Sequence, residues 1–228
     1  MKDRLSACLQ LQDSLNSQIN LFWKEERTEE EFYRAIWTEC AEALDSLPWK
    51  WWKNMSLDMK NLEIEIADIF HFILSLSILK FDDELLYFKK ALTSDFSNLS
   101  KVDGECLNHY LADLYKGDKV REYIFLIERV AEYSLRGDYD NLLFFFGLLV
   151  RDTIGFERLY LLYFGKNILN RIRQEMGYKG GSYNKTTNGV EDNRYLLEVI
   201  NRVENIETLE KEIREAFKRL HQETRGLI

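Results

Sequence analysis

The strongest constraint on the fold is the spacing of apolar residues, which recur at intervals of three and four along most of the chain. The segments "YLADLYKGDKVREYIFLIERVAEYSL" and "LYLLYFGKNILNRIRQEM" are examples. The 228 residues include one proline and eleven glycines, so few positions interrupt a helix. The sequence has no strand alternation, no glycine-rich strand-to-helix turn and no fixed repeat. We therefore predict an all-α fold in which residues 1–228 form a single domain, a multi-helix bundle of about eight or nine helices.

Two pairs of carboxylates predict a metal-binding helical core. Glu39 and Glu42 occur in "TECAEALDSLPWKWWKN", and Glu65 and Asp68 occur in "LEIEIADIFHFILSLSIL". Each i, i+3 spacing places both carboxylates on one helix face. Pro48 ends the first helix, so a short connection would let the second return antiparallel and bring the four carboxylates together. Mg²⁺ or Mn²⁺, which prefer oxygen ligands, would relieve their mutual repulsion.

The surroundings of the second pair distinguish it from an ordinary acidic surface. Glu65 and Asp68 lie in a run that is apolar almost all round and contains no lysine or arginine, so their charges need another partner. The same spacing near the C-terminus occurs among lysines and arginines, as expected of a solvated, salt-bridged face: Glu204, Glu207 and Glu210.

Charge and composition exclude several other functions. A formal net charge of −8 argues against binding to a nucleic-acid backbone. The charged N-terminus is not typical of a signal peptide, and the longest apolar run, residues 69–79, is too short to span a bilayer, so we expect no membrane partner. Cys8, Cys40 and Cys106 have neither metal-ligand nor disulfide spacing. This composition favours a protein of the reducing cytoplasm.

A second candidate group is cationic and lies far along the chain. Lys166, Asn170 and Arg173 follow i, i+4, i+7 spacing and form a polar stripe on one helix face. Gly177 would end that helix and begin a mobile, basic, glycine-hinged loop at about residues 177–193. Such a loop could close over phosphates or could be a solvated surface loop. Beside an acidic metal site, the phosphate role is favoured, and it extends to Tyr178, Lys179 and Lys185.

Aromatic and amide side chains offer a possible base pocket. Trp49 and Trp52 directly follow the first carboxylate pair and could hold a nucleobase, although core or interface packing is the commoner role of such residues. Gln12 and Asn16 share a helix face, and each amide supplies both a donor and an acceptor. His71 follows Asp68 by one turn and could equally be a core histidine.

These residues together resemble the dimeric, all-α dUTPases of the all-α NTP pyrophosphatase superfamily. The resemblance rests on "LQDSLN", "ECAEALDSLPWKWWKN", "IEIADIFHFILS" and "GKNILNRIRQEMGYKGGSYNKTTNGVEDN", which occur in the family's order and cover close to half of the chain. It implies Mg²⁺-dependent hydrolysis of dUTP, and of dUDP as a second substrate, to dUMP with release of pyrophosphate or phosphate. It also implies a homodimer with two sites. Such an enzyme limits uracil incorporation into DNA and supplies dUMP.

The resemblance assigns roles to individual residues. It implies that the metal ligands are Glu39, Glu42, Glu65 and Asp68, with Glu39 or Glu42 also acting on the attacking water. The uracil and deoxyribose would lie among Gln12, Asn16, Trp49 or Trp52, and His71. The groups that face the phosphates would be Lys166, Asn170, Arg173, Tyr178, Lys179 and Lys185. Two alternatives stay open: hydrolysis of another nucleotide such as dCTP, and a non-catalytic helical nucleotide sensor.

Overall fold

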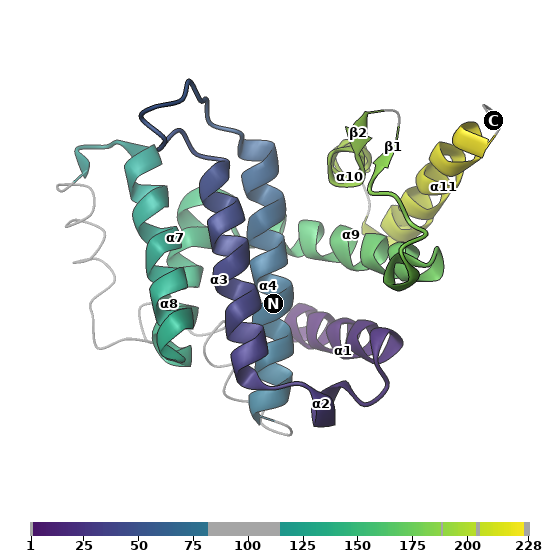
Figure 1. Ribbon diagram of the computed structural model, residues 1–228, viewed down its shortest axis with the longest axis horizontal. Coiled ribbons are helices and arrows are strands. Elements are labelled where there is room, and N and C mark those ends of the chain that lie inside the picture. The colour runs from purple at the N-terminus through teal and green to yellow at the C-terminus, as the bar shows by residue number, and fades with distance from the viewer. Residues whose placement is uncertain (1, 82–114, 188, 204–205, 226–228) are drawn as a thin grey trace.

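The computed structural model describes residues 2–81, 115–187, 189–203 and 206–225 (Figure 1). These residues contain nine α-helices, which confirms the predicted all-α fold. The helices are α1 (Lys2–Ile19), α2 (Trp23–Glu26), α3 (Glu29–Asp45), α4 (Met59–Phe81), α7 (Lys119–Arg136), α8 (Tyr139–Thr153), α9 (Phe156–Glu175), α10 (Asp192–Ile200) and α11 (Ile206–Arg225). Cys106 lies outside the described residues.

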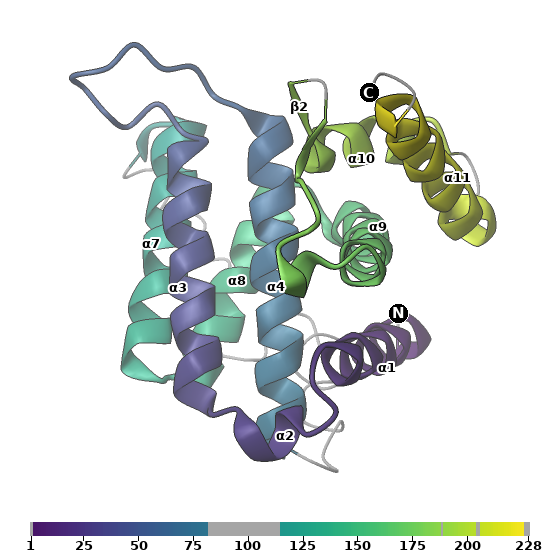
Figure 2. The ribbon, with the colours of Figure 1, turned by 45° about the vertical axis from the view of Figure 1, so that its right-hand side comes forward.

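The helices form a four-helix group flanked by a second group. In Figure 1, α3, α4, α7 and α8 stand side by side, while α1 and α9 lie crosswise beside α4. Figure 2 shows α1 and α9 nearly end-on beside α4, with α10 and α11 beyond α9. Helix α4 therefore lies between the two groups and contacts α1, α3 and α9.

Two clusters of buried apolar side chains fill these layers. One lies among α1, α3, α4, α7, α8 and part of α9, and the other joins α4 and α9 to α10 and α11. Because α4 and α9 contribute to both clusters, the two groups pack as neighbours. The assignment of residues 1–228 to one domain stays a prediction.

Local hydrogen bonds help to fix where α3 begins and where α4 begins. Thr28 and Glu31 form a reciprocal capping box at the start of α3. The helix ends at Asp45, three residues before Pro48, as the sequence predicts. The connection to α4 spans residues 46–58 and is longer than expected. Its two ends are held together by Ser46, which accepts hydrogen bonds from Asp58 N and Asn61 Nδ2, both at 2.9 Å. Helix α4 thus returns antiparallel to α3 (Figure 2).

The segment after α9 is more regular than the sequence indicates. Gly177 follows the end of α9 with φ 84°, so it ends the helix as predicted. A short 3-10 helix, η2 (Tyr178–Gly180), and an antiparallel hairpin, β1 (Thr186–Thr187) with β2 (Val190–Glu191), follow it. The hairpin is an exception to the expected absence of strands. Helix α10 already begins at Asp192, so the expected loop ends earlier than residue 193.

The most apolar helices are largely buried within the chain. Most side chains of α4 from Ile64 to Ser77 and of α8 from Leu142 to Val150 are buried. Their apolar character is therefore explained without a second subunit, and it does not by itself support a dimer. Within the described residues, no helix combines the length and apolar composition needed to cross a membrane.

Candidate functional site

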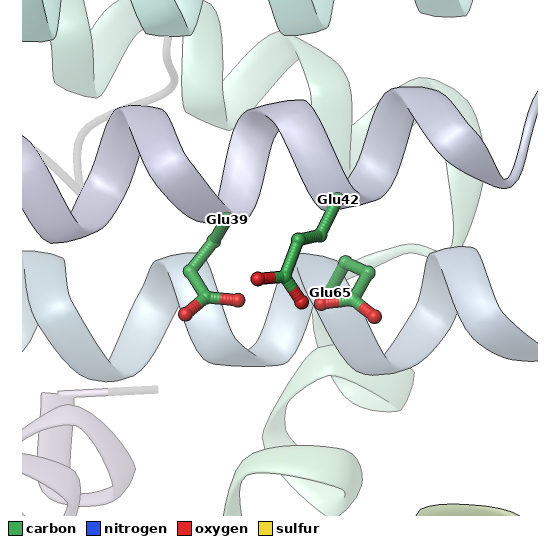
Figure 3. A group of neighbouring side chains, drawn as sticks. All are labelled: Glu39, Glu42 and Glu65. Atoms are coloured by element: carbon green, nitrogen blue, oxygen red, sulfur yellow. The ribbon is translucent and has the colours of Figure 1, made fainter.

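Three glutamates from two helices form an acidic cluster. Glu39 and Glu42 extend from α3 toward Glu65 on α4, and each contributes an oxygen such that all three oxygens lie within 4.8 Å of one another (Figure 3). The antiparallel packing of α3 and α4 creates this approach, because it sets the two acidic faces opposite each other. Carboxylate oxygens at this spacing suit a hard divalent cation such as Mg²⁺.

Asp68, the fourth predicted ligand, is already paired with a cation. Its Oδ2 lies 2.9 Å from Nζ of Lys166, a residue of α9 that is 1% exposed. The amine is also 2.9 Å from Oδ1 of Asn193. Asp68 therefore lies beside the glutamate cluster but does not belong to the set of three close carboxylates.

Burial and charge repulsion raise the pKa of two of the glutamates. Burial, together with the negative charges of Asp68, Glu42 and Glu65, raises the pKa of Glu39 to about 8. Burial and the charge of Asp68 raise the pKa of Glu65 to about 7, while Lys166 acts in the opposite direction. A cation among these carboxylates would remove the repulsion and favour their ionised forms. The donor set thus fits a divalent metal ion.

These shifts predict the pH dependence of stability without metal. Because the folded-state pKa of Glu39 and Glu65 lies above the usual 4.5, the folded chain holds protons that the unfolded chain releases. The free energy of unfolding should therefore fall as pH rises from about 5 to about 8, with a limiting slope of about 1.4 kcal/mol per pH unit for each such proton. Urea unfolding in EDTA would measure the slope. Glu39→Gln should flatten it; parallel slopes for wild type and variant would contradict the assignment.

The acidic cluster opens into a pocket of about 350 Å³ between α1, α3, α4, α9 and the segment after α9. Leu15, Ile19 and Phe72 provide apolar wall. This volume lies within the usual range for small-molecule sites. Twelve residues that the sequence predicts for the site line this pocket: Gln12, Asn16, Glu39, Glu42, Glu65, Asp68, His71, Lys166, Asn170, Arg173, Tyr178 and Lys185.

One wall of the pocket carries the amides and the histidine. His71 Nδ1 lies 2.7 Å from Gln12 Oε1, and Gln12 Nε2 donates to Asn16 Oδ1 at 3.0 Å. Burial lowers the pKa of His71 to about 4, so its ring is neutral near pH 7. His71 is thus both a buried histidine bonded to a neighbouring helix and a pocket residue.

The pocket lining also carries several cations. Arg173 is 7% exposed and forms two hydrogen bonds to Asp192, at 2.9 and 2.7 Å, and a third to Asn170 Oδ1 at 3.0 Å. Lys185 lies over the Tyr178 ring, with Nζ 5.4 Å from the ring centroid. Acidic and basic groups therefore share one cavity, as a metal-bound polyphosphate requires.

Three predicted residues lie outside this pocket. Trp49 and Trp52 belong to the connection after α3; they are 40% and 61% exposed and pack edge to face on each other. The chain carries them past the end of α3, away from Glu39. Lys179 Nζ donates to the carbonyl of Ile19 at 3.0 Å, at the end of α1. Substrate contacts by these three residues stay predictions that the single-chain geometry does not support.

The sequence analysis missed several groups that complete the site. Asn193 lines the pocket and accepts hydrogen bonds from Lys166 and Arg173, while Asp192 pairs with Arg173. Ser75 lies behind the amide wall. The apolar sequence around Ser75 gave no indication that this serine contacts the site, and Asp192 and Asn193 were assigned to a loop. These two residues could have been recognised as the start of a helix, because an Asp-Asn pair precedes a helical pattern there.

A comparison with protein families identifies a matching family. A family model described as dUTPase matches residues 4–178, more than half of the chain. The match includes the acidic cluster, the amide wall and α9, and it ends before Lys185. No curated protein matches the chain.

Proposed function

The chain belongs to the all-α dUTPase family and is thus a dUTP diphosphatase, and we propose that it hydrolyses dUTP to dUMP and pyrophosphate with Mg²⁺, and dUDP to dUMP and phosphate. The observation that carries this proposal is the convergence of Glu39, Glu42 and Glu65 in one pocket with the cations of α9. The proposed metal ligands are these three carboxylates and Asp68.

The chain's own residues have distinct roles in the proposed reaction. When bound, Mg²⁺ would withdraw charge from the phosphate oxygens and make a nearby water more acidic. Glu39 or Glu42 holds the attacking water and accepts its proton as the oxygen approaches phosphorus in line with the leaving group. Lys166 and Arg173 neutralise charge on the departing phosphate group. Their ion pairs with Asp68 and Asp192 keep both cations oriented before substrate arrives.

The remaining pocket residues position the two ends of the nucleotide. Gln12, Asn16 and His71 would contact the uracil and deoxyribose, since their amides and ring supply fixed donors and acceptors. Asn170, Tyr178 and Lys185 would contact the phosphates. We also propose that the basic segment of residues 177–191 closes over the phosphate chain, because Lys185 gains charge-assisted hydrogen bonds only when phosphate is present.

A nucleotide panel tests the proposed function. dUTP, dUDP, dCTP and dTTP would each be incubated with the protein, with Mg²⁺ or with EDTA, and the products separated by chromatography. We expect dUMP and pyrophosphate from dUTP with Mg²⁺, dUMP and phosphate from dUDP, and little product in EDTA. The dCTP reaction should be slower, because a buried amide left unpaired costs about 1–3 kcal/mol. Equal rates on dUTP and dCTP would refute the base assignment.

We further propose that the protein acts as a homodimer in a reducing cytoplasm. Cys8 and Cys40 are buried free thiols, which suits that compartment.

Exposed apolar side chains on α3 and α7 support the proposed dimer, since Trp37 is 37% and Leu135 69% exposed. Such a surface suits a partner of the same kind. Sedimentation at micromolar concentration should give about twice the chain mass; a stable monomer would contradict this assembly.

A further inference from the structure

A buried hydroxyl behind the pocket wall joins the two amides. Ser75 lies on α4 one turn after His71 and is 1% exposed. Gln12 Nε2 and Asn16 Nδ2 each donate to Ser75 Oγ at 3.0 Å. Ser75 Oγ itself donates to the carbonyl of His71 at 3.0 Å. A single hydroxyl is therefore shared by α1 and α4 at this wall.

The hydrogen-bond capacity of Ser75 determines how both amides are oriented. A serine hydroxyl has one hydrogen and two acceptor lone pairs. Its hydrogen is used by the His71 carbonyl, so the oxygen can only accept from the amides. Both NH₂ groups must then face Ser75. The oxygen of Asn16 consequently accepts from Gln12 Nε2 at 3.0 Å, and the oxygen of Gln12 faces His71 Nδ1 and Tyr163 OH.

The orientation of an amide matters for the choice of pyrimidine. Uracil presents a carbonyl acceptor beside an N–H donor on its pairing edge, whereas cytosine presents an NH₂ donor beside a ring-nitrogen acceptor. A carboxamide can satisfy either edge, but the two cases require opposite orientations of its O and NH₂. After its internal bonds, Asn16 still has one N–H and one oxygen lone pair to offer. A side chain whose orientation is fixed can therefore match only one of these edges.

We propose that Ser75 is a positioning residue that sets the preference for uracil over cytosine by holding the Asn16 amide, and with it Gln12, in one orientation. This inference rests on the proposed role of Gln12 and Asn16 in contacting the base. Ser75 does not line the pocket and has no part in the hydrolysis itself. Without its hydroxyl, the Asn16 NH₂ group loses its protein acceptor, and the reversed amide that suits cytosine becomes accessible.

Ser75→Ala tests the proposal through the ratio of kcat/KM for dUTP to kcat/KM for dCTP. We expect the ratio to fall at least about tenfold, the equivalent of about 1.4 kcal/mol, mainly through a lower KM for dCTP and a higher KM for dUTP. The matched control is Ser77→Ala. Ser77 lies on the same helix and is 4% exposed, but its hydroxyl contacts Ile73 O and Tyr139 OH instead of the amides. That variant should keep the wild-type ratio.

The outcomes separate this inference from the proposed function. A wild-type protein that does not hydrolyse dUTP would refute the proposed function. If wild type prefers dUTP and Ser75→Ala loses activity on both nucleotides equally, the proposed function stands and the inference is overturned. Should the alanine variant fail to fold, Ser75→Cys offers a similar volume with a much weaker acceptor. It should also lower the ratio; an unchanged ratio would equally overturn the inference.

Discussion

Replacing Glu42 with glutamine should lower the Mg²⁺-dependent turnover of dUTP by about three orders of magnitude, the scale on which preorganised charge and metal activation act. The substitution keeps the size and polarity of the side chain but removes one of the three carboxylates in the cluster. Glu42 is exposed, so folding should survive the change. Steady-state kinetics and urea unfolding of the same preparation would measure both effects.

Glu63→Gln is the matched control for Glu42→Gln. Glu63 lies two residues from Glu65 on the same helix, but it accepts a hydrogen bond from Arg158 Nη2 at 2.6 Å and does not line the pocket. Its replacement should change turnover less than about threefold and stability by about 1 kcal/mol or less. Near-normal hydrolysis by the Glu42 variant would remove Glu42 from the metal site. Equal losses in both variants would point to a general effect of lost negative charge rather than to a specific role of Glu42 at the metal site.

Lys166→Met should lower dUTP turnover by about two to three orders of magnitude, because it removes a buried positive charge that we propose contacts the phosphates. It should also lower the free energy of unfolding, since Asp68 loses its only ion-pair partner within the described residues. Added Mg²⁺ should recover part of that stability if Asp68 can then bind the metal. Steady-state kinetics and thermal unfolding with Mg²⁺ or EDTA would test the two effects separately.

Lys179→Met provides the comparison for Lys166→Met. Both lysines were predicted to face the phosphates, yet Lys179 caps the end of α1 at the Ile19 carbonyl and lies outside the pocket lining. Its loss should reduce turnover less than about fivefold. A loss as large as that of Lys166→Met would show that Lys179 moves into the site during the reaction, and the pocket geometry described above would then be incomplete.

The parts of the site that were predictable from sequence are those encoded within one helix. The i, i+3 pairs, the Lys166 to Arg173 stripe and the Gln12 and Asn16 face each depend only on helical periodicity, and the pocket includes all of them. The helix end at Gly177 was also predictable, because it depends on the conformational preference of a single residue. A glycine can adopt φ 84° without strain, and a side-chain carbon at Gly177 would approach Ser182 Oγ to 2.1 Å.

The parts that were not predictable depend on packing between distant segments. The pairing of Lys166 with Asp68 requires α9 to cross α4, and no local pattern encodes that crossing. For the tryptophans, closeness in sequence wrongly suggested closeness in space. Trp49 is seven residues from Glu42, and this short separation suggested a shared site. However, α3 ends at Asp45, before Trp49, and Trp49 does not line the pocket.

The location of the bound metal tests the central claim most directly. Crystals of the protein with Mn²⁺ and a non-hydrolysable dUTP analogue would give anomalous difference density for the ion. We predict peaks within coordination distance, roughly 2.0–2.3 Å, of carboxylate oxygens of Glu39, Glu42 and Glu65, with the phosphates of the analogue beside Lys166. Bound analogue with the ion elsewhere, or with no ion among these three glutamates, would contradict the account.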